Sequence, residues 1–333
     1  MKLSVFGGGS WGTAMAHQLA RRGHEVLLWE RETEVAEVIN AVYRYPLFIS
    51  DLDLHPGIIA IYDLGAEADH AEHWLWVVPV QFSGTVMLEL AGNMLDGVAV
   101  ISASKGIETE TLRRMDEVAS EALGLESSRF CCLSGPTFAR EIVRGDPSAA
   151  VLACPDLEFA ASLQEEFSDH HLRCYAGADL IGVELAGALK NVIAIAAGII
   201  DGLGLGFNTQ AALMTRGLHE ITRLGVALGA DAETFRGLAG MGDLVLTCTG
   251  GLSRNRTLGQ RLGRGESLEE ILGSMREVVE GVRTSPAAAR LAHDHEVVMP
   301  ITEAMSRLLK GETDAQTALR ELMTRELKVE AEL

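Results

Sequence analysis

The chain has 333 residues, of which 47% are hydrophobic and 23% are charged, and its formal net charge is −19. This length suggests two domains with cores that need neither disulfides nor a structural metal. The acidic balance argues against a nucleic-acid partner and against adhesion to an anionic membrane, because both call for a basic surface.

Short apolar runs alternate with amphipathic segments over the first half of the chain. Strands are predicted at Leu3–Phe6, Val26–Trp29, Trp74–Val78, Val98–Ala103, Phe130–Leu133, Ala149–Ala153 and Leu172–Tyr175. Helices are predicted at Thr13–Arg22, Ser83–Met94, Thr109–Leu123 and Asp156–Phe167. The piece from Asn40 to Gly57 has no clear period and is expected to be irregular. The alternation indicates βαβ units and a mostly parallel sheet.

After about Gly177 the strand signals fade, and segments rich in Ala, Leu and Gly follow one another. Helices are predicted at Ile181–Ile200, Thr209–Leu228, Ala232–Ala239, Asn255–Arg264, Leu268–Ser274, Ser285–His293 and Thr302–Leu309. The sequence therefore predicts an α/β domain over residues 1–178 and an all-α, substrate-binding domain over residues 179–333.

A glycine-rich turn, Gly7–Gly12, separates the first predicted strand from the first predicted helix. Gly7 allows the tight turn, Gly9 lets the backbone approach a pyrophosphate, and Gly12 lets helix and strand pack closely. The free N–H groups and the positive dipole end of the helix then face the phosphates. In this context the motif predicts that the first domain is a Rossmann domain that binds a dinucleotide.

The end of the second predicted strand carries two conflicting signals for the cofactor. Glu30 lies about twenty residues past the glycine turn and could bind a ribose 2′-hydroxyl, which favours NAD. Arg31 could bind a 2′-phosphate, which favours NADP. The residue that does neither is a solvated surface charge, so the sequence leaves NAD and NADP both open.

Lys190 is the only charged side chain in the apolar segment Leu185–Ile200. A helix that is apolar on nearly all sides is buried. A lysine within it must snorkel, pair with an anion or lose its proton more easily than usual. A lysine of the last kind suits proton transfer near neutral pH.

A second glycine-rich loop, Gly250–Asn255, leads into a predicted helix. Backbone N–H groups, the Ser253 hydroxyl, the Arg254 guanidinium and the Asn255 amide would converge there, which suits a phosphate dianion. The alternatives are a plain N-cap for Ser253 and a solvated charge for Arg254. Asp243 could likewise bind substrate or cap a helix.

Two further polar groups follow predicted strands. Lys105 comes after the strand that ends near Ala103, and Gly135 and Thr137 come after the strand that ends near Leu133. Doubly wound sheets bind ligands at the carboxyl ends of their strands, so these residues are candidate ligand contacts.

The motifs Gly7–Ala16, Ser104–Gly106, Ser134–Glu141, Glu184–Asp201, Thr215–Gly217, Gly240–Asp243, Ser253–Asn255 and Val279–Gly281 follow one another over nearly the whole chain. Together they resemble the bacterial-type NAD(P)-dependent glycerol-3-phosphate dehydrogenases. The resemblance implies a Rossmann domain followed by an all-α domain. It also implies interconversion of sn-glycerol 3-phosphate and dihydroxyacetone phosphate for phospholipid synthesis, and a homodimer.

The resemblance also implies roles for individual residues, with Lys190 as the proton acceptor. The implied cofactor contacts are Ser10, Trp11, Arg31, Lys105, Ala139, Arg254, Val278 and Glu280. The implied substrate contacts are Lys105, Gly135, Thr137, Lys190, Asp243, Ser253, Arg254 and Asn255. The chain departs from the family at Thr137 and Val80, where serine is usual, and in the loop Arg44–Phe48.

The compartment is expected to be the cytoplasm. The five cysteines form no CxxC pair, which predicts reduced thiols and no metal site. The N-terminus shows no signal peptide, and the most apolar stretch, Val192–Ile200, is too short to span a bilayer. Two alternative functions remain open: a dehydrogenase of small hydroxy acids, and a non-catalytic dinucleotide sensor.

Overall fold

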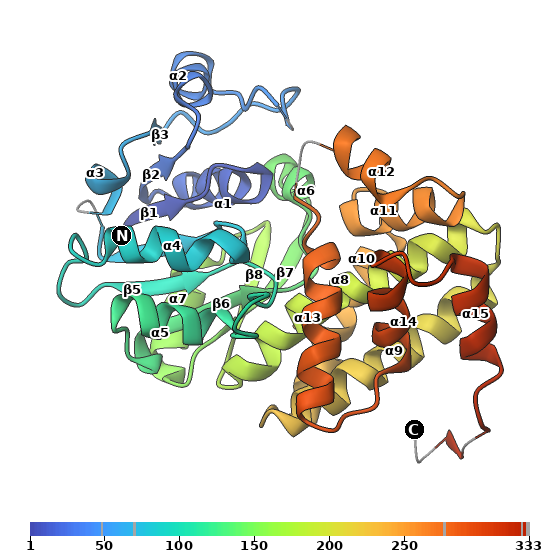
Figure 1. Ribbon diagram of the computed structural model, residues 1–333. Helices are drawn as coiled ribbons and strands as arrows, with labels where there is room; N and C mark the ends of the chain where they lie inside the picture. Colours follow the sequence, from blue (N-terminus) through green and yellow to red (C-terminus); the bar gives the residue numbers. More distant parts are fainter. Residues whose placement is uncertain (48, 69–70, 276–277, 328, 331–333) are drawn as a thin grey trace. The chain divides into compact units, whose positions relative to one another are not determined.

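The computed structural model describes residues 1–47, 49–68, 71–275, 278–327 and 329–330. The chain divides into two compact units (Figure 1). The first unit contains Met1–Lys105 and Arg114–Leu180, and the second contains Gly106–Arg113 and Ile181–Leu333. The short segment Gly106–Arg113 thus packs with residues far from it in the sequence, which local patterns do not reveal.

The first unit is built on one sheet (Figure 1). Its described strands are β1 (Lys2–Phe6), β2 (Glu25–Trp29), β3 (Ile58–Ile61), β4 (His73–Trp76), β5 (Ala99–Ser102), β6 (Phe130–Ser134), β7 (Ser148–Ala153) and β8 (Leu172–Gly177). They lie in the order β3-β2-β1-β4-β5-β6-β7-β8, and among them only β6 and β7 pair antiparallel. The predicted mostly parallel sheet is confirmed. Because β2 and β4 flank β1, the order reverses at β1, which is where such sheets bind ligands.

Helices connect these strands. They are α1 (Ser10–Arg21), α2 (Thr33–Val42), α3 (Leu64–Ala68), α4 (Val80–Leu90), α5 (Met115–Leu123), α6 (Ala139–Arg144) and α7 (Leu157–Phe167), with a 3₁₀ turn at Ser127–Arg129. The prediction that one helix starts at Thr109 is wrong. Leu112 has a left-handed φ of 61°, which a helix cannot continue through, and α5 starts only after Arg114. The Glu117 carboxylate accepts the Arg114 N–H at 2.9 Å and so fixes this start.

The segment from Asn40 to Gly57 is irregular as expected, although the end of α2 lies within it. The helix stops at Val42 because Tyr43 adopts a left-handed φ of 52°. Beyond it Tyr45, Ile49 and Leu54 are buried in the core of the first unit. Their spacing follows no secondary-structure period, which is why the sequence shows none. Phe48, in the loop that departs from the family pattern, lies outside the described residues.

The second unit consists of helices joined by turns and loops, with no strand among its described residues. Its helices are α8 (Leu180–Gly202), α9 (Phe207–Ala227), α10 (Asp243–Thr249), α11 (Arg254–Gly263), α12 (Leu268–Ser274), α13 (Glu280–Asp294), α14 (Pro300–Leu309) and α15 (Ala315–Met323). The predicted helix at Ala232–Ala239 is instead a 3₁₀ turn, Ala232–Arg236, followed by a π-helical turn, Leu238–Gly242. Gly237 between them is extended, which separates the two turns.

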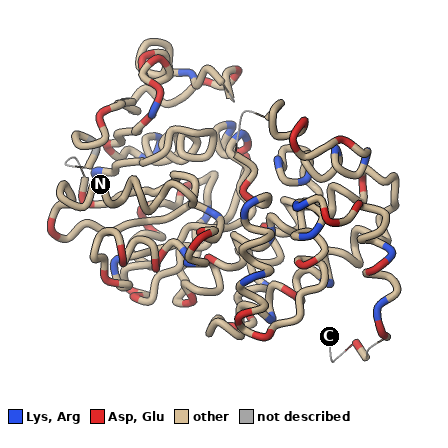
Figure 2. The backbone as a smooth tube through the Cα atoms, viewed as in Figure 1, with Lys and Arg blue, Asp and Glu red and all other residues tan. Residues whose placement is uncertain are grey.

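Helix α8 forms the core of the second unit. With 23 residues this helix, of which the stretch Val192–Ile200 is only a part, is long and apolar enough to cross a membrane by length and composition alone. Its most hydrophobic window is nevertheless entirely buried, which is the property of a core helix. Figure 2 marks the acidic and basic residues along the chain, which occur in both units.

Glycines bring α8 and α11 into backbone contact. A Cβ atom on Gly198 would lie 2.0 Å from the carbonyl oxygen of Arg256, and one on Gly259 would lie 2.0 Å from that of Ile195. One turn further along each helix, Gly202 and Gly263 face each other in the same way. Only glycine permits such an approach. The contact fixes the start of α11 relative to the middle of α8.

Candidate active site

The glycine turn of the first unit has the geometry of a phosphate-binding loop. Gly7 has a φ of +111°, and a Cβ on it would lie 2.8 Å from the backbone of Val77. A Cβ on Gly12 would lie 1.9 Å from the Gly7 carbonyl oxygen, so helix and loop pack as closely as predicted. Gly9 instead borders open space, since a Cβ there would meet no described atom within 4 Å.

These observations fit a dinucleotide. Gly9 is the N-cap of α1 and, as a glycine, has no side chain that could cap the N–H groups of the first turn. Such N–H groups at a helix start are the donors whose hydrogen bonds a pyrophosphate would accept. Ser10 begins the helix, and Trp11 packs against the core while its Nε1 has no partner among the described residues. Ala139 begins α6, a different helix of the same unit.

Glu30 and Arg31, at the carboxyl end of β2, lie in opposite environments. The Glu30 side chain is turned inward toward the glycine turn, and the residue is only 4% exposed. A Cβ on Gly8 would lie 2.2 Å from its Oε2. Burial raises the pKa of the Glu30 carboxyl from 4.5 to about 7. Arg31 points outward, with a side chain that is 79% exposed, and pairs with Glu32 at 3.0 Å.

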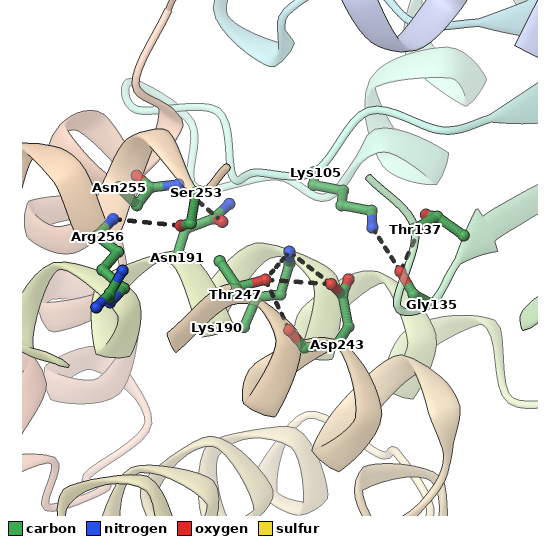
Figure 3. A network of polar contacts seen from close by, with 10 residues as sticks. All are labelled: Lys105, Gly135, Thr137, Lys190, Asn191, Asp243, Thr247, Ser253, Asn255 and Arg256. Carbon is green, nitrogen blue, oxygen red and sulfur yellow. Dashed lines mark hydrogen bonds and ion pairs between the residues drawn. The ribbon is translucent and has the colours of Figure 1, made fainter. Parts of the chain in front are cut away.

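Lys105, Gly135 and Thr137 form a second polar group in the first unit (Figure 3). Lys105 Nζ donates to the Gly135 carbonyl oxygen at 3.3 Å, and Thr137 Oγ1 donates to the same oxygen at 3.1 Å. The sequence-based expectation that these residues follow strand ends is confirmed, and the structure shows that the two strands, β5 and β6, pair with each other. Gly135 approaches the next strand closely, because a Cβ on it would lie 2.8 Å from the Ala150 Cα.

Lys190, in the middle of α8, is buried and paired (Figure 3). Its Nζ donates to Asp243 Oδ1 at 2.8 Å and to Thr247 Oγ1 at 2.7 Å. The Thr247 hydroxyl in turn donates to the Asp243 main-chain carbonyl at 2.6 Å, so its oxygen is oriented to accept from Lys190. Of the three alternatives for this lysine, pairing is the one observed, and snorkelling is excluded.

Asp243 and Thr247 come from one short helix. Asp243 is the first residue of α10 and is 2% exposed, and Thr247 lies one turn further on the same face. Asp243 therefore accepts from Lys190 and is not the N-cap that the sequence allowed. Sequence reasoning missed Thr247, although its position four residues after Asp243 could have indicated it. Burial raises the pKa of the neighbouring Cys248 thiol to about 12, which excludes a thiolate there.

The start of α11 gathers the other predicted residues of the second unit. Ser253 is the N-cap, since its hydroxyl accepts the Arg256 N–H at 3.2 Å. Asn255 donates to Asn191 Oδ1 at 3.0 Å and accepts the Gly281 N–H at 3.0 Å. The Asn255 side chain thus joins α11 to the residue after Lys190. Asn191 is a second residue that sequence reasoning did not single out.

Arg254 links this turn to the residues before α13. It is exposed, and its Nη1 donates to the Val278 carbonyl oxygen at 3.2 Å. Glu280 follows as the first residue of α13. The cofactor residues implied in the second unit, Arg254, Val278 and Glu280, are therefore neighbours in space.

The comparisons with known proteins agree across both units. Residues 2–160 match the model of the NAD-dependent glycerol-3-phosphate dehydrogenase N-terminus, and residues 179–320 match the model of its C-terminus. The chain belongs to the NAD-dependent glycerol-3-phosphate dehydrogenase family. The resemblance found in the sequence is confirmed.

Individual members of the family are similar to this chain over its full length. A relative from Nitratidesulfovibrio vulgaris, named glycerol-3-phosphate dehydrogenase (NAD(P)+), is 49% identical over 99% of this chain and 100% of its own length. A relative from Geobacter metallireducens with the same name is 50% identical over 99% of this chain and 98% of its own length. The crystal structure of glycerol-3-phosphate dehydrogenase from Coxiella burnetii has a TM-score of 0.93 and 36% identity, and covers 97% of this chain and 99% of that one.

Proposed function

We propose that this chain interconverts sn-glycerol 3-phosphate and dihydroxyacetone phosphate with NAD or NADP. The observation that carries the proposal is the buried, hydrogen-bonded group Lys190–Asp243–Thr247. It lies in the same unit as the glycine-rich loop at the start of α11. A dinucleotide sensor would have no use for a buried, hydrogen-bonded lysine. Burying an ammonium without a partner is unfavourable, and Asp243 and Thr247 supply the partners that allow Lys190 to hold a proton here.

Lys190 is the proposed proton carrier. When the alcohol is oxidised, Lys190 takes the hydroxyl proton, and when the ketone is reduced, Lys190 returns a proton to the carbonyl oxygen. Asp243 stabilises the ammonium form and aims it, and Thr247 holds both groups in one orientation. Asn191, one residue along α8, is kept in place by Asn255.

The start of α11 is the proposed phosphate site. Its first N–H groups, the Ser253 hydroxyl and the Arg254 guanidinium are donors of the kind that a phosphate dianion needs. The capping bond to Ser253 leaves its hydroxyl proton for another acceptor, because the oxygen accepts from Arg256. Because the chain carries a net charge of −19, these donors have to attract the phosphate dianion against a repulsive average field.

The first unit is proposed to hold the cofactor. A nicotinamide dinucleotide, when bound, supplies the acceptor or donor of the hydride. Gly7–Gly12 with Ser10 and Trp11 would hold the pyrophosphate. Arg31 and Ala139 are further proposed cofactor contacts in this unit. In the second unit Arg254, Val278 and Glu280 are proposed to contact the cofactor as well.

Lys105 is proposed to contact both ligands, whereas Gly135 and Thr137 contact the substrate. The shared Gly135 carbonyl oxygen holds the Lys105 ammonium and the Thr137 hydroxyl at one strand end. We propose that residues 1–178 form the dinucleotide-binding domain and that residues 179–333 form the substrate-binding domain.

Cofactor oxidation by the purified chain tests the proposal. Absorbance at 340 nm is followed with NADH or NADPH and dihydroxyacetone phosphate, and turnover is expected. Dihydroxyacetone without the phosphate, and a small 2-oxo acid, should react far more slowly. Preferential turnover of the 2-oxo acid would establish the hydroxy-acid alternative. Binding of dinucleotide without any turnover would establish the sensor.

We also propose that the enzyme supplies glycerol 3-phosphate to phospholipid synthesis in the cytoplasm, as a homodimer. All five cysteines are buried free thiols, which suits a reducing compartment. Light scattering on the purified chain would give the mass in solution, and a monomer at micromolar concentration would contradict the dimer.

A further inference from the structure

We propose that Glu30 makes this enzyme prefer NAD(H) to NADP(H), by accepting a hydrogen bond from the adenosine ribose 2′-hydroxyl. The inference rests on the proposed dinucleotide binding of the first unit and names which of the two cofactors that unit selects. The sequence leaves open whether Glu30 or Arg31 determines the cofactor preference. The burial of Glu30 and the exposure of Arg31 favour Glu30.

The Glu30 carboxyl lies directly beside the phosphate-binding loop. It ends β2, the neighbour of β1, and its Oε2 faces Gly8 within the glycine turn. Any side chain at position 8 would collide with this oxygen, so loop and carboxyl are fitted to each other. In Rossmann folds an acidic residue at this place reads the ribose hydroxyls.

One oxygen of this carboxyl lacks a hydrogen bond. Glu30 Oε2 is buried and has no hydrogen-bond partner within the described part of the chain, while the Glu32 N–H approaches Oε1 at a long 3.5 Å. An acceptor that is buried without a donor is unfavourable. A ribose 2′-hydroxyl at this strand end would supply the missing donor after a small turn of the side chain. A 2′-phosphate has no such proton to give and would face a carboxylate.

Arg31 is poorly placed to offset this repulsion. Its side chain is 79% exposed and its Nη2 pairs with Glu32 at 3.0 Å, so its charge is both solvated and partly neutralised. To bind a 2′-phosphate it would have to leave this partner and turn back toward the strand. The buried acid therefore dominates the discrimination.

The charged groups around Glu30 are few. From its own loop, the Glu32 charge raises the pKa of Glu30 and the Arg31 charge lowers it. The glycine turn packed against it has no ionisable side chain. On the β3 side Asp63 follows the strand, but its carboxylate accepts the N–H groups of Gly65 and Ala66. The pKa of Glu30 is raised to about 7 mainly by burial, so the test is made at pH 8, where the carboxyl is ionised.

Dissociation constants for NADH and NADPH, measured by calorimetry without substrate, test the proposal. The wild-type chain should bind NADH at least about tenfold more tightly, the equivalent of one charge-assisted hydrogen bond. Glu30→Gln should reduce this ratio at least about tenfold. Arg31→Ala should change it less than about threefold. Glu34→Gln removes the same charge from an exposed position of α2 and serves as the matched control with an unchanged ratio.

The possible outcomes distinguish a failure of the proposed function from a failure of the proposed role of Glu30. If the wild-type chain binds neither dinucleotide, the proposed function fails. If it binds both and the ratio is the same in Glu30→Gln as in the wild type, the role of Glu30 is refuted. Tighter binding of NADPH than NADH by the wild type, abolished in Arg31→Ala, would assign the discrimination to Arg31 instead. Should Glu30→Gln not fold, Glu30→Asp, which withdraws the carboxylate by one methylene, should lower the ratio as well.

Discussion

Replacing Lys190 by Met tests how the proposed proton carrier is held. An isolated buried ammonium would make this change stabilising, because a charge is removed from an apolar core. The structure reverses the sign of this expectation. Asp243 is 2% exposed and loses its ion pair with Lys190, so the variant leaves a buried carboxylate without this cation.

Breaking a buried ion pair from one side costs about 3–5 kcal/mol. Thr247 Oγ1 lies 3.2 Å from Asp243 Oδ1 and can turn its single proton from the Asp243 main-chain carbonyl to the carboxylate. Exchanging a neutral hydrogen bond for a charge-assisted one offsets about 1 kcal/mol. Lys190→Met should therefore lower the free energy of unfolding of the second unit by about 2–4 kcal/mol. The double variant Lys190→Met with Asp243→Asn should recover most of this loss, because no charge is then left buried.

Urea unfolding can assign the effect to one unit. All four tryptophans, Trp11, Trp29, Trp74 and Trp76, lie in the first unit, whereas the helical second unit contributes strongly to circular dichroism at 222 nm. The dichroism transition should shift in the single variant more than the fluorescence transition does. Both variants should lose about 10²–10⁴-fold in kcat, since a positioned general base is gone. A single variant as stable as the wild type, or a double variant with restored kcat, would refute the reasoning.

Three further predictions follow from the geometry. Arg254→Ala should raise KM for glycerol 3-phosphate about 10- to 100-fold through the loss of a charge-assisted contact, and unchanged discrimination between glycerol 3-phosphate and glycerol would place the phosphate elsewhere. Gly259→Ala puts a Cβ 2.0 Å from the Ile195 carbonyl oxygen, so α11 must move away from α8. In a steady-state assay, kcat/KM of this variant should fall by up to about 10²-fold. The control Gly273→Ala, which has open space at its Cβ, should keep the kcat/KM of the wild type. Burial raises the pKa of Glu30 from 4.5 to about 7, so its contribution to stability is full below pH 4.5 and is lost as the pH rises to about 7; Glu30→Gln should flatten that part of a curve of unfolding free energy against pH, and parallel curves would contradict the burial of this acid.

Much of the site is local in the sequence and could be predicted. Gly7–Gly12 lies between one strand and the helix that follows it, so its geometry depends on nearby residues alone. The same holds for Ser253 as the N-cap of α11. Lys105 and Gly135 could each be placed at the carboxyl end of a strand, although only the structure shows that the two strands pair. These features need only propensity, spacing and the alternation of elements.

The sequence did not decide what depends on contacts between distant elements. Whether the buried Lys190 is paired depends on Asp243, which is 53 positions away in the sequence and lies on α10. The choice between Glu30 and Arg31 depends on which side chain turns toward Gly8, and a strand end lets neighbouring residues point to opposite sides. The start of α5 and the buried loop after α2 likewise depend on backbone conformations and packing that leave no periodic pattern.

The sequence by itself thus determined the class of each unit, the glycine turn after the first strand and the resemblance to the family. Only the tertiary structure decided how the candidate site residues are charged, paired and oriented. The physical reason is that backbone conformation follows mainly from neighbours along the chain. Desolvation, ion pairing and hydrogen bonding depend instead on neighbours in space, as the pairing of Lys190 with Asp243 and the burial of Glu30 show.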